Sequence, residues 1–339
     1  MLEHLEPLCS LYGISGNEKN VRDYIIENIE GKCSYYVDAL GNIIAFKPGK
    51  KEKAKKIMIA AHMDEVGMIV TDVNSDGTLS FEAVGGVNSE VIAGRQVYIY
   101  EKNIQGVIGS KAVHNMSSSE RDKKISAEDL CIDIGASDKE DAEKYISPGD
   151  CVTFMSGSTA MGDDSICSKA LDDRAGCAIM LDLINTELDY GVYFVFTVQE
   201  EVGLRGAGTA AFQVSPDFAI VLETTTASDI SGVSGASRVC ELGKGAVVSY
   251  MDKRTVYDRE LYELAFSLAE KAKINCQTKT LVAGGNDAGA IHISGNGVRT
   301  IAVSAPCRYL HSPSCMARRS DIEACENLTK LLITGINKL

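Results

Sequence analysis

The sequence predicts an α/β protein in which a mixed sheet is covered by helices and a small β barrel is inserted. Residues 57–61 form a short apolar run, typical of a strand that is buried on both faces of a sheet. Strand and helix patterns alternate after residue 161, which indicates a helix-covered sheet. Between residues 72 and 161, short strand patterns are separated by Gly, Asn, Asp and Ser, as in a small barrel. We therefore assign residues 1–71 and 162–339 to one α/β domain, and residues 72–161 to an inserted β domain.

The first part of the chain predicts a helix, a hairpin and a buried strand. Ser15 and Glu18 form a capping-box pattern, and apolar residues at helical spacing follow as far as Ile29. Residues 34–37 and 43–46 flank a Gly-Asn turn and predict a hairpin. A basic loop then leads to the strand at 57–61.

The remaining elements follow from the same patterns. In and around the insert we expect strands at 67–73, 79–84, 96–100, 105–109, 131–134 and 151–154, a helix at 137–145 and a polar loop at 116–129. Beyond it we expect helices at 172–187, 206–212, 257–271 and 287–293 and strands at 192–198, 218–222 and 299–303. Ser320 is the predicted cap of a last helix.

Composition excludes several classes of protein. The chain of 339 residues has 47 Asp and Glu against 34 Lys and Arg, a net charge of −13, which argues against nucleic-acid or anionic-membrane partners. No apolar run approaches the roughly 18 residues of a membrane span, and the start lacks a signal-peptide pattern, so we expect a cytoplasmic protein. The 11 cysteines are odd in number and include no Cys-x-x-Cys pair, which predicts free thiols.

Polar side chains follow several of the predicted strands at the point where each strand ends. His62 and Asp64 come after the strand at 57–61, and Glu200 and Glu201 come after the strand at 192–198. Glu223 and His311 follow two later strands, and Asp172 begins a helix. Because sites in open α/β sheets lie at the carboxyl ends of the strands, we expect these side chains to meet.

Histidine and carboxylate ligands without thiols suit a hydrolytic zinc, cobalt or manganese site. A two-metal centre needs a bridging carboxylate, one or two histidines and a further acid as general base. The set that fits is His62, Asp172, Glu201, Glu223 and His311. Glu200 is then left as the base, and Asp64 can orient His62.

Other interpretations of these residues are weaker. Singly, His62 could be a core histidine, the two glutamates a solvated face and Asp172 a helix cap. Residues 206–211 mimic a dinucleotide fingerprint, but they do not follow their strand closely enough. A glycoside hydrolase built on paired carboxylates would leave the histidines without a role. A catalytic Cys–His pair that uses Cys315 has no local support.

Five motifs in chain order resemble the M42 family of metallo-aminopeptidases, which includes glutamyl, deblocking and tetrahedral aminopeptidases. They are residues 60–67, 169–176, 199–207, 284–290 and 311–313. The resemblance covers nearly the whole chain, including the insert. It implies a zinc-peptidase-like catalytic domain that removes N-terminal residues from short peptides.

The resemblance also implies a role for each site residue. One of two divalent ions (Zn, Co or Mn) would be held by His62 and Glu223 and the other by Glu201 and His311, with Asp172 bridging. Glu200 would be the general base for a metal-bridging water, and Asp64 would hold His62. The peptide bond between Asp172 and Asp173 is expected to be cis.

Further implications concern assembly and substrate. The insert would be a dimerisation domain, and dimers would assemble into dodecamers. The loop of Gly284, Gly285, Asn286 and Asp287 would contribute to the substrate pocket, although many relatives carry Thr at position 286, Asp at position 223 and an acid shortly after His311. Arg254 and Arg308 would suit an acidic N-terminal residue. A non-catalytic scaffold relative is the alternative function.

Overall fold

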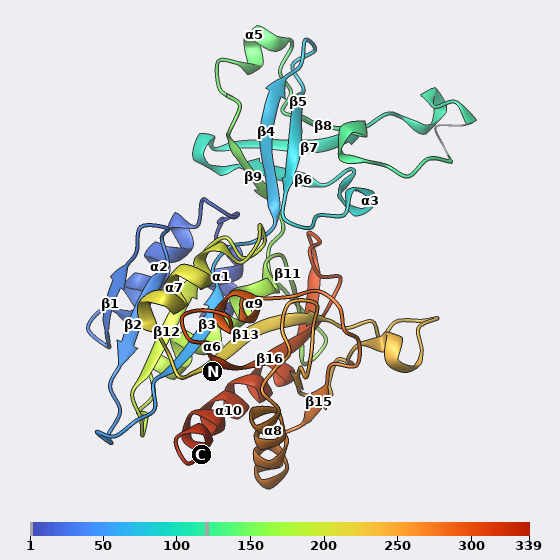
Figure 1. The fold of residues 1–339 in the computed structure, drawn as a ribbon. Coiled ribbons are helices and arrows are strands. Elements are labelled where there is room, and N and C mark those ends of the chain that lie inside the picture. Colours follow the sequence, from blue (N-terminus) through green and yellow to red (C-terminus); the bar gives the residue numbers. More distant parts are fainter. Residues whose placement is uncertain (1–2, 119–121) are drawn as a thin grey trace.

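The computed structural model describes residues 3–118 and 122–339 and contains a large α/β part from which a barrel projects (Figure 1). The main sheet has the order β1-β2-β12-β3-β13-β16-β17-β11-β10, with β14 and β15 attached beside β16. Its central strands β12, β3, β13 and β16 are parallel, and antiparallel strands flank them, so the sheet is mixed as predicted. The strands of this sheet are β1 Ser34–Val37, β2 Ile43–Lys47, β3 Ile57–His62, β10 Thr159–Met161, β11 Ser165–Ser168, β12 Val192–Thr197, β13 Phe218–Thr226, β14 Ala246–Val248, β15 Cys276–Thr278, β16 Arg299–Arg308 and β17 Cys315–Arg318.

Helices cover both faces of this sheet, which confirms the predicted α/β class. The larger core lies under α1, α2, α6, α8 and α10, and a smaller core lies under α7 and α9 on the opposite face. Helix α6 is buried almost all round, including the charged residues Asp172, Asp173 and Arg174 in its first turn. The helices are α1 Leu5–Ser10, α2 Lys19–Ile29, α6 Leu171–Ile184, α7 Arg205–Val214, α8 Arg259–Ala272, α9 Ala288–Ile291 and α10 Arg319–Ile336.

The barrel closes in the order β4-β5-β8-β7-β6-β9 around a core of its own. Its elements are β4 Gly67–Val73, β5 Leu79–Val84, α3 Ser89–Ile92, β6 Gln96–Ile99, β7 Ile104–Ser110, β8 Leu130–Asp133, α5 Lys139–Ala142 and β9 Cys151–Phe154. The barrel strands thus run from Gly67 to Phe154, whereas we assigned residues 72–161 to the insert. Strand β4 begins only five positions after His62, and β10 belongs to the main sheet.

Two predicted helix caps are wrong. Helix α2 begins at Lys19, and the hydroxyl of Ser15 donates instead to Asp64 Oδ2 at 2.6 Å. Helix α10 begins at Arg319, and the hydroxyl of Ser320 donates to Asp164 Oδ2 at 2.6 Å. In both places a tertiary acceptor competes successfully with the helix end for the serine hydroxyl.

Several short elements lacked a sequence signal. Strands β10, β11, β14, β15 and β17 have only three or four residues each, too few for a period to be visible. The predicted helix at 137–145 is the single turn α5, while β13 and β16 extend beyond their predicted ends. Of the predicted loop at 116–129, residues 119–121 lie outside the described residues, and residues 127–129 form a short 3₁₀ helix.

The cysteines and helices add two simpler findings. All 11 cysteines are free thiols, as predicted. Within residues 3–118 and 122–339, no helix is both long enough and apolar enough to cross a membrane. The cytoplasmic location stays a prediction from the sequence.

Two carboxylates meet where α6 packs against α10, and they predict a pH-dependent stability. Burial and the neighbouring Asp182 raise the pKa of Glu326 from its usual 4.5 to about 7. Between these values the folded protein holds a proton that the unfolded chain releases, so the free energy of unfolding falls as the pH rises. We expect Glu326→Gln to abolish this pH dependence. As the pH rises from 4 to 8, the free energy of unfolding of the variant should increase relative to that of wild type by about 1–3 kcal/mol. Urea unfolding at several pH values measures it.

The control for that prediction is Glu323→Gln on the same helix, where the side chain is less buried. A difference between Glu326→Gln and wild type that does not change with pH would contradict the assignment of the shifted pKa to Glu326.

Candidate metal centre

The carboxyl ends of the central strands bring the first pair of predicted ligands together. His62 is the last residue of β3, and Glu223 lies in the neighbouring parallel strand β13. Because Val221 pairs with Ala60, two residues earlier on each strand, His62 and Glu223 stand at the same level of the sheet. Their side chains approach to 3.4 Å, measured from His62 Nε2 to Glu223 Oε1.

The main chain fixes which nitrogen of His62 faces the site. His62 Nδ1 lies 3.1 Å from the carbonyl oxygen of Asp64, which can only accept a hydrogen bond. Nδ1 therefore carries the proton, and Nε2 presents its lone pair to the site, as a metal-binding histidine requires. The carboxylate of Asp64 is slightly farther from this nitrogen, at 3.4 Å.

Two sets of three donor atoms share the carboxylate of Asp172. Its Oδ1 lies 3.4 Å from His62 Nε2, which also faces Glu223. Its Oδ2 lies 3.2 Å from His311 Nε2, which is 3.3 Å from Glu201 Oε2. Donor atoms about 3.3–3.6 Å apart are what tetrahedral zinc needs with bonds of about 2.0–2.2 Å. In each set the imidazole nitrogen therefore lies close to this spacing from two carboxylates, and Asp172 joins the two sets.

Asp172 reaches this position through an irregular start of α6. The peptide bond between Asp172 and Asp173 is cis, as the resemblance implied, and both residues have non-helical backbone angles. The carboxylate of Asp173 is fully buried and accepts the N–H of Gly176 at 3.0 Å. It also lies near His62 and Glu223, so it could bind a cation there, a possibility that the sequence interpretation missed.

The site concentrates buried negative charge that lacks partners. Asp172 Oδ1, Asp173 Oδ2 and Glu201 Oε1 are buried without a hydrogen bond. Burial, reinforced by Asp172, raises the pKa of Glu201 to about 7, and burial raises the pKa of Glu223 well above its usual range. Buried carboxylates of this kind need compensating positive charge, which bound divalent ions would supply.

Asp64 also organises the two glutamates that follow β12. Its Oδ1 accepts the N–H of Glu200 at 3.0 Å, and its Oδ2 accepts the N–H of Glu201 at 3.1 Å and the hydroxyl of Ser15. Glu18 accepts the adjacent N–H of Gln199. Asp64 therefore holds the backbone of Glu200 and Glu201 as well as lying beside His62. The sequence pattern of Ser15 and Glu18 indicates only a helix cap and gives no sign of these contacts.

A cavity of about 790 Å³ opens onto this cluster. Glu200 lines it, and burial raises the pKa of that carboxyl well above its usual range. Gly284, Gly285 and Asn286 line it too, as expected for a substrate loop. Asp287 does not: it is buried, and its carboxylate accepts the Thr197 hydroxyl at 2.5 Å. Arg308 is also absent from the lining and pairs with Asp229 at 2.6 Å.

The cavity lining also contains three basic residues, of which the sequence analysis predicted only Arg254. Its acidic residues are Asp172, Glu200, Glu201 and Glu223, and its other charged residues besides His311 are Lys253, Arg254 and Lys279. A Cβ at Gly285 would lie 2.3 Å from Arg254 Cγ, and one at Gly289 would lie 2.7 Å from Arg254 Cβ. The glycines therefore make room for the stem of Arg254.

A buried ion network joins the two segments that carry His62 and Asp172. Lys169 Nζ lies 2.8 Å from both carboxylate oxygens of Glu65, and Arg174 Nη2 lies 3.4 Å from one of them. Arg174 Nε also donates to the carbonyl of Met63, next to His62, at 2.9 Å. All three charged side chains are at most 2% exposed. The network therefore locks the start of α6 against the end of β3.

The barrel touches the site through Gly86, and this contact gives a prediction. A Cβ at Gly86 would lie 2.9 Å from His311 Nδ1, too close without movement. We expect Gly86→Ala to displace the imidazole and weaken binding at the His311 side about 10- to 100-fold, as other disturbances around metal ligands do. Metal titration by calorimetry measures it. Gly157→Ala, where a Cβ meets nothing within 4 Å, is the control; equal affinity in both variants would contradict the contact.

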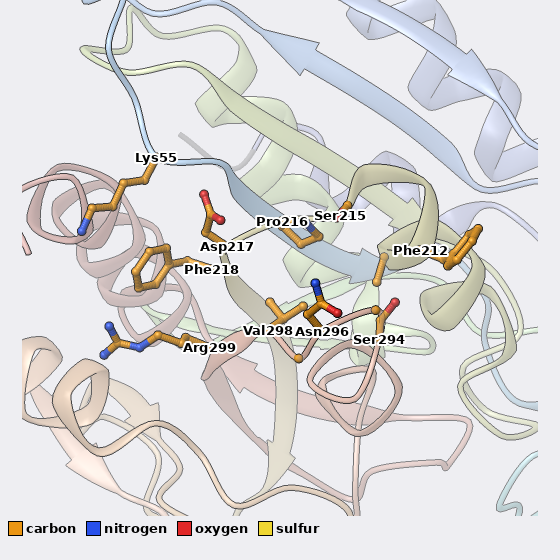
Figure 2. Close-up of a pocket in the computed structure, with 13 residues that line it drawn as sticks. Lys55, Phe212, Ser215, Pro216, Asp217, Phe218, Ser294, Asn296, Val298 and Arg299 are labelled. Carbon is orange, nitrogen blue, oxygen red and sulfur yellow. The ribbon is translucent and has the colours of Figure 1, made fainter.

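A second cavity, of about 440 Å³, lies at the opposite edge of the sheet (Figure 2). Phe218 and Arg299, which begin β13 and β16, line it together with Lys55. Each of its charged side chains already has a partner. Arg299 pairs with Asp258 and Glu260, Asp217 accepts the N–H of Lys56, and Lys55 Nζ lies over the ring of Phe218. The candidate chemistry therefore lies at the carboxyl edge.

Comparisons with known proteins find similar sequences and structures over almost the whole chain. The sequence profile of the family described as M42 glutamyl aminopeptidase matches residues 41–328. A putative aminopeptidase of Acetivibrio thermocellus is 41% identical over 99% of this chain and 98% of its own length. The TET aminopeptidase of a marine sediment archaeon, Thaumarchaeota archaeon SCGC AB-539-E09, superposes with a TM-score of 0.93 at 33% identity, over 98% of this chain and 95% of that one. The TET1 peptidase of Pyrococcus horikoshii, which can assemble into a tetrahedron or a large octahedral shell, gives 0.86 at 35% identity over 98% of both chains.

Proposed function

Because the chain belongs to the M42 family of aminopeptidases, we propose that it removes the N-terminal residue of short peptides with two divalent metal ions. His62, Glu223 and Asp172 would hold one ion, and His311, Glu201 and Asp172 the other. The observation that carries this proposal is that Asp172 lies between the two histidines, with Oδ1 3.4 Å from His62 Nε2 and Oδ2 3.2 Å from His311 Nε2. Glu223 and Glu201 lie 3.4 and 3.3 Å from the same two nitrogens. Zinc, cobalt and manganese all suit these donors.

The residues of the chain divide the reaction between them. The bound ions would supply Lewis-acid polarisation of the scissile carbonyl and a more acidic water. Glu200 lines the cavity, binds no ion in this scheme, and would take the proton of the attacking water and return it to the leaving amine. Asp64 would keep Glu200 in place through its backbone N–H. The surrounding carboxylates would attract the free α-amine of the substrate, which favours the N-terminal bond.

The basic side of the cavity supports a preference for an acidic N-terminal residue. Lys253, Arg254 and Lys279 line the cavity, and Lys279 Nζ is anchored on the carbonyl of Ala283 at 3.0 Å. Asp252 accepts the N–H of Arg254 at 2.7 Å and the hydroxyl of Tyr257 at 2.6 Å, which fixes the loop that carries the two other cations. A glutamate or aspartate side chain would meet charge-assisted donors there.

Metal removal and a substrate panel test the proposed function. We expect about two metal ions per chain, and chelator-sensitive release of p-nitroaniline from glutamyl and aspartyl p-nitroanilides ahead of leucyl and lysyl ones. Bound metal without release from any residue would favour the scaffold alternative. Chelator-insensitive hydrolysis of a β-glucan would favour the glycoside hydrolase.

The acid preference has its own test in Arg254→Met, which keeps the apolar stem but removes the donors. Since a hydrogen bond to a charged group contributes about 1.5–3 kcal/mol, we expect kcat/KM for the glutamyl substrate to fall roughly 10- to 100-fold, with little change for the leucyl substrate. Lys271→Met, on the exposed surface of α8, is the control. An equal loss of kcat/KM on both substrates would show that Arg254 does not bind the acidic side chain of the substrate.

Assembly completes the proposal. The P. horikoshii TET1 peptidase can assemble into a tetrahedron or a large octahedral shell, and this chain matches it over 98% of its length. We infer a homo-oligomer in which the barrel makes the dimer contact and dimers form a dodecamer. Light scattering coupled to size exclusion tests it, and a monomer at micromolar concentration would contradict it.

A further inference from the structure

The loop of residues 198–201, directly after β12, is held by side chains from distant parts of the chain. Each of its four backbone N–H groups donates to a side-chain oxygen, and three of the four acceptors are carboxylate oxygens. In order along the loop, the acceptors are Asn42 Oδ1 at 3.0 Å, Glu18 Oε1 at 3.2 Å, and Asp64 Oδ1 and Oδ2 at 3.0 and 3.1 Å. Because backbone N–H groups inside a protein need partners, these three side chains determine the path of the loop.

Gln199 is the residue at which the loop turns away from β12. Its φ of 57° lies in the left-handed region, which is uncommon for a residue with a Cβ atom. Glu200 comes next and lines the cavity, so the backbone conformation at Gln199 sets the direction of the Glu200 side chain. The hydrogen bond from the N–H of Gln199 to Glu18 fixes the backbone at this turn.

The carboxylate of Glu18 is itself held firmly. Glu18 is only 3% exposed, and the oxygen that accepts the N–H of Gln199 also accepts the N–H of Gly16 at 2.7 Å. Glu18 stands directly before α2, which begins at Lys19 and buries its apolar face in the main core. The acceptor of the Gln199 N–H is therefore attached to a packed helix and not to a free loop.

The segment before α2 is also joined to the turn that carries Asp64. Ile14 forms a β-bridge with Glu65, and the hydroxyl of Ser15 donates to Asp64 Oδ2 at 2.6 Å. The carboxylates of Glu18 and Asp64 thus belong to two segments that are bonded to each other. Together they support the loop 198–201 as one unit.

We propose that Glu18 is a positioning residue that fixes the backbone turn at Gln199 and thereby aims Glu200 at the metal centre. Glu18 is not among the residues that line the cavity, so it would act through the loop and not on the substrate. A base must lie within hydrogen-bond reach of the water that it deprotonates, and a displacement of about 1 Å can cost about 100-fold in rate. The effect on the reaction rests on the proposed function, in which Glu200 is the base.

Two substitutions at position 18 test this role. Glu18→Ala removes the acceptor of the Gln199 N–H, so we expect kcat to fall about tenfold or more with little change in KM or metal content. Glu18→Gln keeps an oxygen that can accept both N–H groups and should restore most of the activity, with the acidic limb of the pH profile of kcat/KM unchanged. Steady-state kinetics and metal analysis measure these effects. Glu27→Ala, at an exposed position of α2, is the control.

Hydrogen exchange tests the contact without reference to activity. In metal-loaded Glu18→Ala we expect the backbone amides of residues 199–201 to exchange at least about fivefold faster than in wild type, because the loop opens more often once a hydrogen bond is lost. Glu18→Gln should stay close to wild type. Mass spectrometry of peptic peptides that contain residues 199–201 measures the exchange.

Several outcomes would overturn the inference. Unchanged exchange in Glu18→Ala would overturn the contact, and a normal kcat despite faster exchange would overturn the positioning role. Loss of metal along with activity would assign the effect to the neighbouring Glu201. A shifted acidic limb in Glu18→Gln would mean that the charge of Glu18 acts on the base and its hydrogen bond does not. A wild-type protein without peptidase activity would contradict the proposed function, whereas exchange would still test the hold of Glu18 on Gln199.

Discussion

Replacing Glu200 with glutamine is expected to lower kcat by a factor of about 10²–10⁴, the usual contribution of a general base, while the protein stays folded and loaded with metal. Glutamine keeps the size of the side chain and the backbone N–H that Asp64 accepts, so the loop should not move. Only the ability to take a proton is lost. Steady-state kinetics on a glutamyl substrate, together with metal analysis, measures the effect.

The control for Glu200→Gln is Glu270→Gln, an exposed glutamate near the end of α8. Near-full activity of Glu200→Gln with two ions bound would show that Glu200 is not the general base. A variant that loses metal along with activity would instead place Glu200 among the ligands.

Replacing Glu65 with leucine is expected to lower the free energy of unfolding by about 3–5 kcal/mol. The substitution leaves Lys169 and Arg174 buried without their carboxylate, although carbonyl groups of residues 8–13 still accept hydrogen bonds from them. Such unpaired buried cations are costly, because water cannot solvate them. Urea unfolding with and without metal measures the change.

A second substitution tests whether charge is the cause. Adding Lys169→Met to Glu65→Leu removes one stranded cation, so the double variant should be more stable than Glu65→Leu alone. A single-variant effect below about 1 kcal/mol would mean that the network contributes little, as exposed ion pairs do. A double variant less stable than the single one would assign the loss to packing.

The sequence predicted those parts of the fold that show a regular spacing of apolar residues, and those site residues that stand where a predicted strand ends. The apolar run at 57–61 became the fully buried strand β3, and the alternation after residue 161 became α6, β12, α7 and β13. His62 ends β3, and Glu201 and His311 follow β12 and β16 at the same edge of the sheet, so topology indicated that they would meet. Glu223, which we expected just after its strand, lies inside the longer β13. Short strand patterns also indicated the barrel.

Features that depend on tertiary partners could not be predicted in this way. Ser15 looked like a helix cap because its acceptor, Asp64, lies 49 residues away in sequence. The sequence predicted that Asp287 contributes to the substrate pocket, but its buried carboxylate accepts the hydroxyl of Thr197. The sequence also predicted that Arg308 is available to an acidic substrate residue, but Arg308 pairs with Asp229. Lys169 and Arg174 flank Asp172 within one motif. Their place beside a predicted ligand was the only sign in the sequence that they take part in a buried network near the site.

The ligand set also has a consequence for biosynthesis. His62 is reached early in translation, whereas His311 lies in the hairpin between β16 and β17, immediately before the last helix. Chains emerge from the ribosome N-terminus first, at about 5–20 residues per second. A nascent or prematurely terminated chain that stops before the hairpin therefore lacks His311, one ligand of the proposed metal centre. Proteolytic competence would arrive only with nearly finished chains, which would protect neighbouring nascent peptides without a separate inhibitory segment.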